Sequence, residues 1–215
     1  KFSIRINLKG EKYLDGLNEF SFQHPKTRSW YFEKHFYDLA TKLNIFAPYY
    51  DYVNLYINGE SSGIMALEEV YGKETFVRLN KPESIIIRID DNKLNEQLVR
   101  NYKESDIVLH YPNINNIKSG DESFENFKYA SGILENFLNG KLKPSEAFDI
   151  NSIGKFLAFA DIFKAYHGLD ATNMFFYYNK YNNKLEPMLY DSDPLLGTGY
   201  SSTIYEYNFI KQFFL

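Results

Sequence analysis

The sequence contains no cysteine, which excludes disulfide bonds and thiolate metal sites. It also lacks any run of about 18 apolar residues, the length needed for a membrane-spanning helix. A formal net charge of -4 argues against a protein that holds nucleic acid on a basic face. A glycine-rich G-x-G-x-x-G nucleotide-binding loop is missing as well, since "LKGEKYLDG" has too few glycines in the wrong spacing.

Tyrosine and phenylalanine are abundant instead, with 19 of each among 215 residues. These side chains bury large surfaces, so we expect most of them in a core. The apolar fraction of 44% and the charged fraction of 24% are typical of a globular protein and exclude disorder as the main state. The length allows one large core, or two lobes that share a cleft.

The first 75 residues predict a small mixed lobe. "FSIRINL" alternates apolar with polar residues, as a half-buried strand does, and "LNEFSFQHP" predicts a second strand that ends at Pro25. From Ser29 the period becomes helical, with apolar residues at Phe32, Phe36, Leu39, Ala40 and Leu43. "YDYVNLYINGESSGIMALEEV" then predicts a hairpin whose turn is Asn58-Gly59.

Residues 76–215 predict a mainly helical lobe that carries a second hairpin. "PESIIIRIDD" is typical of a buried strand, whereas residues 92–121 are too polar to assign. "ESFENFKYASGILENFLNG" predicts a helix that ends at Gly140. "FDINSIGKFLAFADIFKAYHG" predicts another, capped by Asp149 or Asn151 and ending just before Gly168. Two strands around "YNNK" follow it.

Oxygen-bearing side chains stand at both ends of this second hairpin. Asp170 and Asn173 lie in the turn before it, and Asp191 and Asp193 come directly after it. Hard divalent cations prefer carboxylate and amide oxygens as ligands. Phosphoryl transfer needs such a cation on the phosphates and a carboxylate near the attacking hydroxyl. The pattern therefore predicts that the hairpin folds its two acidic ends into one metal site.

The order of the motifs resembles the spore coat protein H (CotH) kinase family, a divergent branch of the protein-kinase-like fold. The resemblance rests on "RINLKG", "VNLYINGESSGIMALEE", "FDINSIGKFLAFADIF", "DATNMFFYYN" and "YDSDPLLG", in which Tyr190 replaces the family's usual Trp. It implies an α+β, atypical protein-kinase-like two-lobed fold. Residues 1–75 would form the strand-rich N-terminal lobe and residues 76–215 the mainly helical C-terminal lobe of one kinase-like domain.

The same resemblance implies ATP-dependent phosphorylation of protein hydroxyls (Ser/Thr) with Mg²⁺ or Mn²⁺. Carried over by position, Asp170 is the catalytic carboxylate, while Asn173, Asp191 and Asp193 hold the metal. Which of the two aspartates is the main ligand stays open, and Asp170 and Asn173 are two residues closer together than in ordinary kinases. The acceptor would be a coat protein, a surface protein or the chain itself, and the resemblance favours an exported or spore-associated location.

The identity of the basic residue that binds the phosphates is left open. Ordinary kinases use a strand lysine that is paired with a helix glutamate. The candidates here are Arg5, Lys9 and Arg28 as cations, Glu33 as the helix partner, and Glu68 and Glu69 at the hinge between lobes. Arg5 and Lys9 also suit an ordinary solvated strand face.

Other classes of function remain as alternatives. A catalytically inactive pseudokinase or structural protein of coat or cell-surface assembly is favoured by the missing glycine-rich loop. It is opposed by the presence of Asp170, Asn173 and Asp191 together. A glycosyltransferase could use an Asp-x-Asp pair, but it usually has a doubly wound nucleotide-binding half. The long helices oppose a carbohydrate-binding module.

Each candidate residue also has a structural interpretation. Asp170 could cap a turn, because Asp and Asn form local hydrogen bonds there. Asp191 and Asp193 could mark a strand exit before Pro194. His167 could be a helix-end residue that interacts with the helix dipole.

Overall fold

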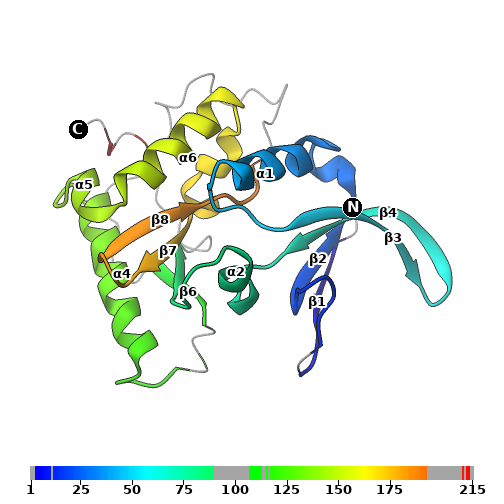
Figure 1. Cartoon of the computed structure of the whole chain (residues 1–215), viewed down its shortest axis with the longest axis horizontal. Helices are drawn as coiled ribbons and strands as arrows, with labels where there is room; N and C mark the ends of the chain where they lie inside the picture. The colour runs from blue at the N-terminus through cyan, green and yellow to red at the C-terminus, as the bar shows by residue number, and fades with distance from the viewer. Residues whose placement is uncertain are drawn as a thin grey trace, which may run out of the picture. The chain divides into compact units, whose positions relative to one another are not determined.

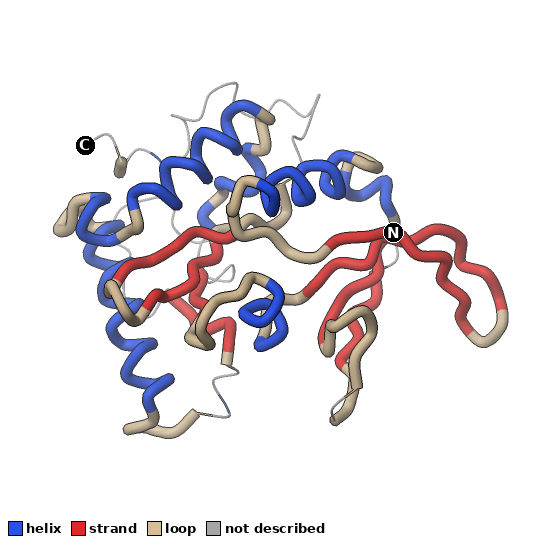
Figure 2. Tube along the Cα trace, viewed as in Figure 1, coloured by secondary structure: helices blue, strands red, loops and turns tan. Residues whose placement is uncertain are grey.

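The computed structural model describes residues 3–10, 12–89, 107–112, 115, 117–192, 210 and 212–213 (Figure 1). The chain divides into two compact units, Lys1–Pro82 and Glu83–Leu215. Each unit contains a four-stranded antiparallel sheet together with helices (Figure 2), which confirms the α+β class. A lobe boundary after residue 75, and the joining of both lobes in one kinase-like domain, stay predictions. Among the described residues, no helix is both long and apolar enough to cross a lipid bilayer.

The sheet of the first unit has the strand order β1-β2-β4-β3. Its elements, in chain order, are β1 (Ser3–Asn7), β2 (Glu19–Gln23), the 3-10 helix η1 (Pro25–Arg28), α1 (Phe32–Lys42), β3 (Tyr50–Ile57), β4 (Glu60–Glu69) and α2 (Lys73–Arg78). The two predicted N-terminal strands and the predicted helix are thus confirmed, although Phe2 lies outside the described residues. β2 ends two residues before Pro25, which has no N–H to donate to a ladder. The helix α2 was not predicted.

The turn between β3 and β4 is the predicted Asn58-Gly59 turn. Asn58 has φ 52° and Gly59 has φ 85°, so both occupy the left-handed region. A two-residue hairpin loop of type I′ requires positive φ at both positions, which Asn-Gly adopts readily. The first hairpin is therefore set by its local sequence.

Helix α1 covers one face of this sheet and contacts β3. Its buried apolar residues are Phe36, Tyr37 and Ala40, and the Tyr37 ring lies 5.8 Å from the Tyr50 ring of β3. Leu39 and Leu43, which the helical period placed on the same face, are 38% and 46% exposed. That part of the prediction was wrong because the buried stripe follows Glu33, Phe36, Tyr37 and Ala40, and because α1 ends before Leu43. On the opposite face Phe20, Phe22, Met65 and Leu67 form a second cluster.

The sheet of the second unit has the order β6-β5-β7-β8. Its elements are β5 (Ile86–Ile89), β6 (Ile107–Tyr111), α4 (Glu122–Leu138), α5 (Pro144–Ala147), α6 (Ile150–Ile162), η4 (Tyr166–Leu169), η5 (Ala171–Asn173), β7 (Phe175–Asn179) and β8 (Lys184–Met188). The buried strand, both long helices and the second hairpin were predicted. β6 lies in the unassigned stretch 92–121, part of which is outside the described residues. This unit therefore carries a full sheet besides its helices.

The helix ends of the second unit agree in part with the prediction. Asp149 is the N-cap of α6, since its Oδ1 accepts from the backbone N–H of Ser152 at 2.8 Å. α4 ends two residues before Gly140, which takes φ 69° as a helix-ending glycine does. α6, however, ends at Ile162 and Lys164 takes the left-handed conformation, so Gly168 is not its terminator.

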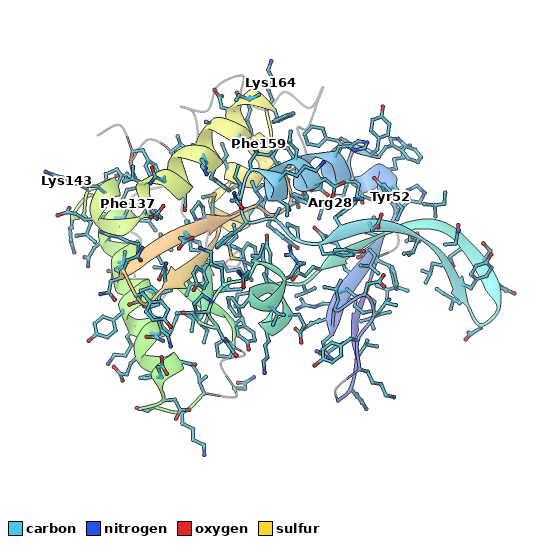
Figure 3. The ribbon with its side chains drawn as sticks, in the orientation of Figure 1. Arg28, Tyr52, Phe137, Lys143, Phe159 and Lys164 are labelled. Carbon is cyan, nitrogen blue, oxygen red and sulfur yellow. The ribbon has the colours of Figure 1, made fainter. Side chains whose placement is uncertain are left out.

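Aromatic side chains fill the core of the second unit, as their abundance suggested. The rings of Phe137 on α4 (Figure 3) and Phe148 lie 4.7 Å apart, and Phe148 reaches Phe176 of β7 at 5.7 Å. Phe156 on α6 is completely buried. This packing holds α4 and α6 against the sheet that carries the second hairpin.

Candidate active site

The turn between α6 and β7 presents Asp170 to solvent. Backbone hydrogen bonds shape this turn: the N–H of Asp170 donates to His167 O at 3.1 Å, and the N–H of Asn173 donates to Asp170 O at 2.8 Å. The Asp170 carboxylate makes no hydrogen bond or ion pair with any residue that the structure describes. The described contacts therefore give it no turn-capping role, and its exposure allows it to meet a ligand.

The side chain of Asn173 has a defined orientation. Its Nδ2 donates to the backbone O of His167 at 2.9 Å. When the amide nitrogen donates such a bond, the amide carbonyl oxygen can still accept a bond from, or bind to, another partner. Asn173 is half-buried at the end of η5, directly before β7. Its oxygen is thus a candidate ligand for a hard cation.

Asp191 lies against the same turn, although 17 residues of chain separate it from Asn173. Its Oδ2 is 3.4 Å from Nε2 of His167, and its side chain is 16% exposed. The backbone of Asp191 is left-handed, with φ 45°, a conformation that Asp tolerates better than most residues. The structure thus brings Asp191 to the segment that carries Asp170 and Asn173, whereas Asp193 lies outside the described residues.

A glycine allows this close approach. A Cβ atom on Gly168 would lie 2.9 Å from Ser192 Oγ and 3.1 Å from the backbone O of Tyr190. Real Cβ atoms almost never come this close, so the segment around Asp191 rests directly on the backbone of η4. The sequence placed Gly168 only at a helix end and offered no signal for this contact.

The change Gly168→Ala is expected to destabilise the protein by about 1–3 kcal/mol, the usual cost of overpacking. Ser192 is completely buried and cannot move aside freely. Urea unfolding measures the change. Gly154→Ala is the matched control, because the position is inside α6 and, apart from its neighbours in the helix, no described atom lies within 4 Å of the added methyl group. Equal stability of the two variants would contradict the close contact.

The donor set suits a magnesium or manganese ion. No group of three or more His, Asp or Glu side chains that could hold a metal occurs among the described residues. Kinase-type magnesium sites do not need one, because one or two protein carboxylates act together with the phosphates of the substrate. Asp191 and Asn173 offer one carboxylate and one amide oxygen, which are the ligand types that these ions prefer.

In the first unit, Arg28 and Glu33 form a buried ion pair. Arg28 Nε lies 3.3 Å from Glu33 Oε2; the Glu33 side chain is completely buried and that of Arg28 is 16% exposed. Between them, Ser29 and Trp30 have φ 49° and 58°, two successive left-handed residues that reverse the chain. The hydroxyl of Tyr52 donates to Trp30 O at 2.6 Å and fixes this reversal.

A tyrosine completes the surroundings of Glu33. The hydroxyl of Tyr37 donates to Glu33 Oε1 at 3.0 Å. Burial, reinforced by the charges of Glu33 and Glu68, raises the pKa of Tyr37 well above its usual value, so the hydroxyl stays a donor. Glu68 is also buried and accepts from Nε2 of Gln23. Sequence reasoning missed both Tyr37 and Gln23, because their partners are decided by sheet and helix packing.

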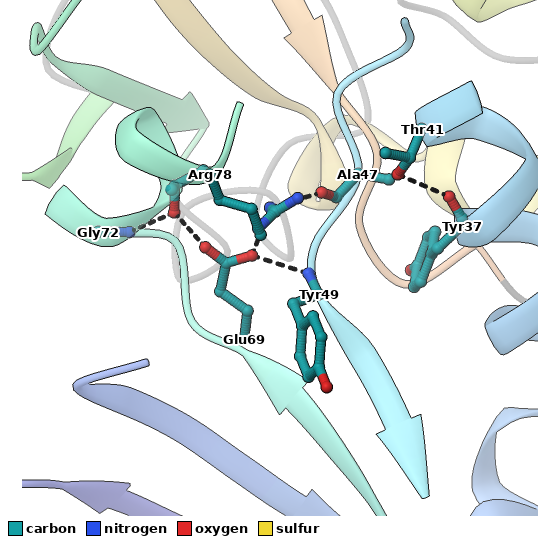
Figure 4. Close-up of polar contacts among 8 residues, drawn as sticks. Tyr37, Thr41, Ala47, Tyr49, Glu69, Gly72 and Arg78 are labelled. Carbon is teal, nitrogen blue, oxygen red and sulfur yellow. Dashed lines mark hydrogen bonds and ion pairs between the residues drawn. The ribbon is translucent and has the colours of Figure 1, made fainter. Parts of the chain in front are cut away.

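Glu69 joins β4 to the helix that follows it (Figure 4). Its Oε1 accepts from Thr75 Oγ1 at 2.6 Å, and its Oε2 accepts from the N–H of Tyr49 at 2.7 Å. Oε2 also accepts from Nη2 of Arg78. These contacts use both carboxylate oxygens within the first unit, which favours a structural role for Glu69. Its role in binding the cofactor stays a prediction.

The other two candidate cations are on the surface. Arg5 is on β1 and its Nε lies 2.6 Å from Glu19 Oε1 on β2, with the Arg5 side chain 60% exposed. Lys9 is exposed just beyond the end of β1. Arg28, by contrast, is paired with the predicted helix glutamate. The contacts therefore favour Arg28 among the three as the counterpart of the kinase lysine.

Comparison with known proteins gives one clear match. The family model described as CotH kinase protein matches residues 1–210 of the chain. No curated protein matches it. The family match covers nearly the whole chain and includes both the Arg28–Glu33 segment and the second hairpin with its acidic ends. The chain therefore belongs to the CotH kinase family, a family of atypical protein kinases.

Proposed function

We propose that the protein is an active kinase that transfers a phosphoryl group from ATP to protein hydroxyls (Ser/Thr) with the help of Mg²⁺ or Mn²⁺. The observation that carries this proposal is the exposed Asp170 carboxylate, for which the described part of the chain provides no partner, on the same turn that Asp191 packs against. A purely structural aspartate at this position would be expected to have a partner.

In this proposal Asp170 orients the acceptor hydroxyl and takes its proton as the hydroxyl oxygen bonds to the γ-phosphorus of ATP, while the bond from that phosphorus to ADP breaks and ADP leaves. Asn173 and Asp191, with Asp193 beside them, would hold the cation through their oxygens. When bound, the cation supplies positive charge that neutralises the phosphates. The short Asp170-to-Asn173 spacing is compatible with this division, because Asn173 turns its nitrogen to His167 O and keeps its oxygen available.

The first unit would supply the residues that bind the phosphates of the nucleotide. Arg28, held by Glu33, corresponds in chemistry to the kinase lysine that is paired with a helix glutamate. Roles for Lys9, Arg5 and Glu69 in cofactor binding remain part of the proposal, although their contacts offer less support. The two compact units would correspond to the N-terminal and C-terminal lobes of one kinase-like domain.

The acceptor is proposed to be a protein: a coat or surface protein, or the chain itself. The family resemblance favours an exported or spore-associated setting for this reaction. A serine-rich protein is the appropriate first substrate to test in a transfer assay, because it offers many hydroxyl groups that can reach the Asp170 carboxylate.

Binding of ATP with Mn²⁺ is expected to stabilise the protein by about 2.7 kcal/mol at a ligand concentration 100 times its Kd. Thermal unfolding with and without ligand measures this, and transfer of labelled phosphate to the protein or to a serine-rich acceptor tests catalysis. Stabilisation without transfer would favour a nucleotide-binding pseudokinase. Neither stabilisation nor transfer would favour a structural protein and would overturn the proposal.

A further inference from the structure

One residue, His167, contacts two of the three side chains that the proposed function assigns to the metal, Asp191 and Asn173. Its imidazole Nε2 lies 3.4 Å from Asp191 Oδ2. Its backbone O accepts from Asn173 Nδ2 at 2.9 Å. These two groups come from opposite ends of the second hairpin, so His167 links the two halves of the proposed site.

We propose that His167 is the positioning residue of this site: it aims the Asp191 carboxylate and the Asn173 amide oxygen at the position of the cation. The inference rests on the proposed function. His167 acts through its neighbours, so it is not a catalytic residue. Groups that hydrogen-bond the ligands of a metal and so orient them typically contribute 10–100-fold to the metal affinity.

His167 acts on the two ligands in different ways, through its imidazole on Asp191 and through its backbone O on Asn173. Asp191 has a left-handed backbone, and its carboxylate Oδ2 lies 3.4 Å from the imidazole of His167. Gly168, next to His167, lets the chain around Asp191 come within contact of η4. The imidazole is 26% exposed, which leaves it mostly enclosed beside the carboxylate.

The competing structural interpretation, a helix-end histidine, does not fit. α6 ends at Ile162, five residues before His167, so its dipole is not the partner of this imidazole. The imidazole instead lies 3.4 Å from the Asp191 carboxylate.

The test compares His167→Ala, His167→Gln and His167→Asn by Mn²⁺ binding, measured as free Mn²⁺ by electron paramagnetic resonance with a non-hydrolysable ATP analogue present. Gln places an amide nitrogen near the position of Nε2, whereas the shorter Asn does not reach it. We expect about 10–100-fold weaker Mn²⁺ binding for His167→Ala and His167→Asn, and recovery of most of the affinity for His167→Gln. His35→Ala, on the exposed face of α1, is the control and should bind as the wild type does.

Melting temperatures without metal separate positioning from folding. If His167 has a merely structural role, its replacement lowers the melting temperature measured without metal, and His167→Gln binds Mn²⁺ no more tightly than His167→Asn. Wild-type affinity in all three variants would overturn the role of His167 and leave the proposed function intact. Failure of the wild-type protein to bind Mn²⁺ would overturn both. If His167→Ala does not fold, the Mn²⁺ affinities of His167→Gln and His167→Asn decide whether His167 positions the ligands.

Discussion

Replacement of Asp170 by Asn is expected to lower the rate of phosphoryl transfer by about 10²–10⁴, the usual contribution of a positioned general base. Asn keeps the size and much of the hydrogen-bonding capacity of Asp, but it cannot take the proton of the acceptor hydroxyl. Because the Asp170 side chain is exposed and makes no described contact, the melting temperature should not change. Initial rates of labelled-phosphate transfer at saturating ATP and Mn²⁺ measure the loss.

Two further variants make this result specific. Asp191→Asn should also lose activity, but higher Mn²⁺ concentrations should restore part of it, since the lost carboxylate is proposed to bind the cation. No Mn²⁺ concentration should restore Asp170→Asn. Glu125→Gln, which neutralises an exposed carboxylate on α4 of the same unit, should transfer phosphate as the wild type does. Wild-type rates for Asp170→Asn would remove Asp170 from the mechanism.

The change Arg28→Ala is expected to destabilise the protein by about 3–5 kcal/mol, the typical cost of removing one partner from a buried ion pair. Glu33 is completely buried 3.3 Å from the guanidinium. Glu68, a second carboxylate, is also buried in this unit. Loss of the guanidinium beside Glu33 Oε2 leaves a buried negative charge without its cation, so that its solvation cost is not repaid. Urea unfolding gives the free energy of unfolding.

An exposed arginine–glutamate pair in the same unit provides the control. Arg5 and Glu19 lie closer together, at 2.6 Å, but the Arg5 side chain is 60% exposed. Surface ion pairs contribute about 0–1 kcal/mol, so Arg5→Ala should have a small effect. Adding Glu33→Gln to Arg28→Ala should recover part of the lost stability, because it removes the buried charge. Similar losses for the two single arginine variants would show that burial does not decide the strength of these pairs.

Local signals predicted much of the fold. Asn58-Gly59 specifies its own turn because both residues tolerate positive φ. Asp149 caps α6 through a hydrogen bond to a residue three positions on, and Gly140 follows the end of α4. The strands of both hairpins could be recognised from short apolar runs between turn residues. In each case the chemistry lies within a few residues of the chain.

The candidate site was predictable in its residue types but not in its contacts. Carboxylates and an amide at the ends of a hairpin indicated a hard cation and phosphoryl transfer. The contact between His167 and Asp191 could not be found in this way, because 23 residues of chain, the second hairpin among them, separate the two positions. The choice among Arg5, Lys9 and Arg28 was open for the same reason.

By itself, the sequence determined the elements that depend on neighbouring residues, the family through the order of its motifs, and the kind of chemistry its polar side chains can perform. The tertiary structure alone decided that Arg28 is the arginine buried against Glu33, that Glu69 is occupied by Thr75, Tyr49 and Arg78, and that Gly168 admits the chain around Asp191. Turns and caps follow from local backbone geometry and hydrogen bonds. Burial and pairing depend on residues that only the packing of sheets and helices brings together.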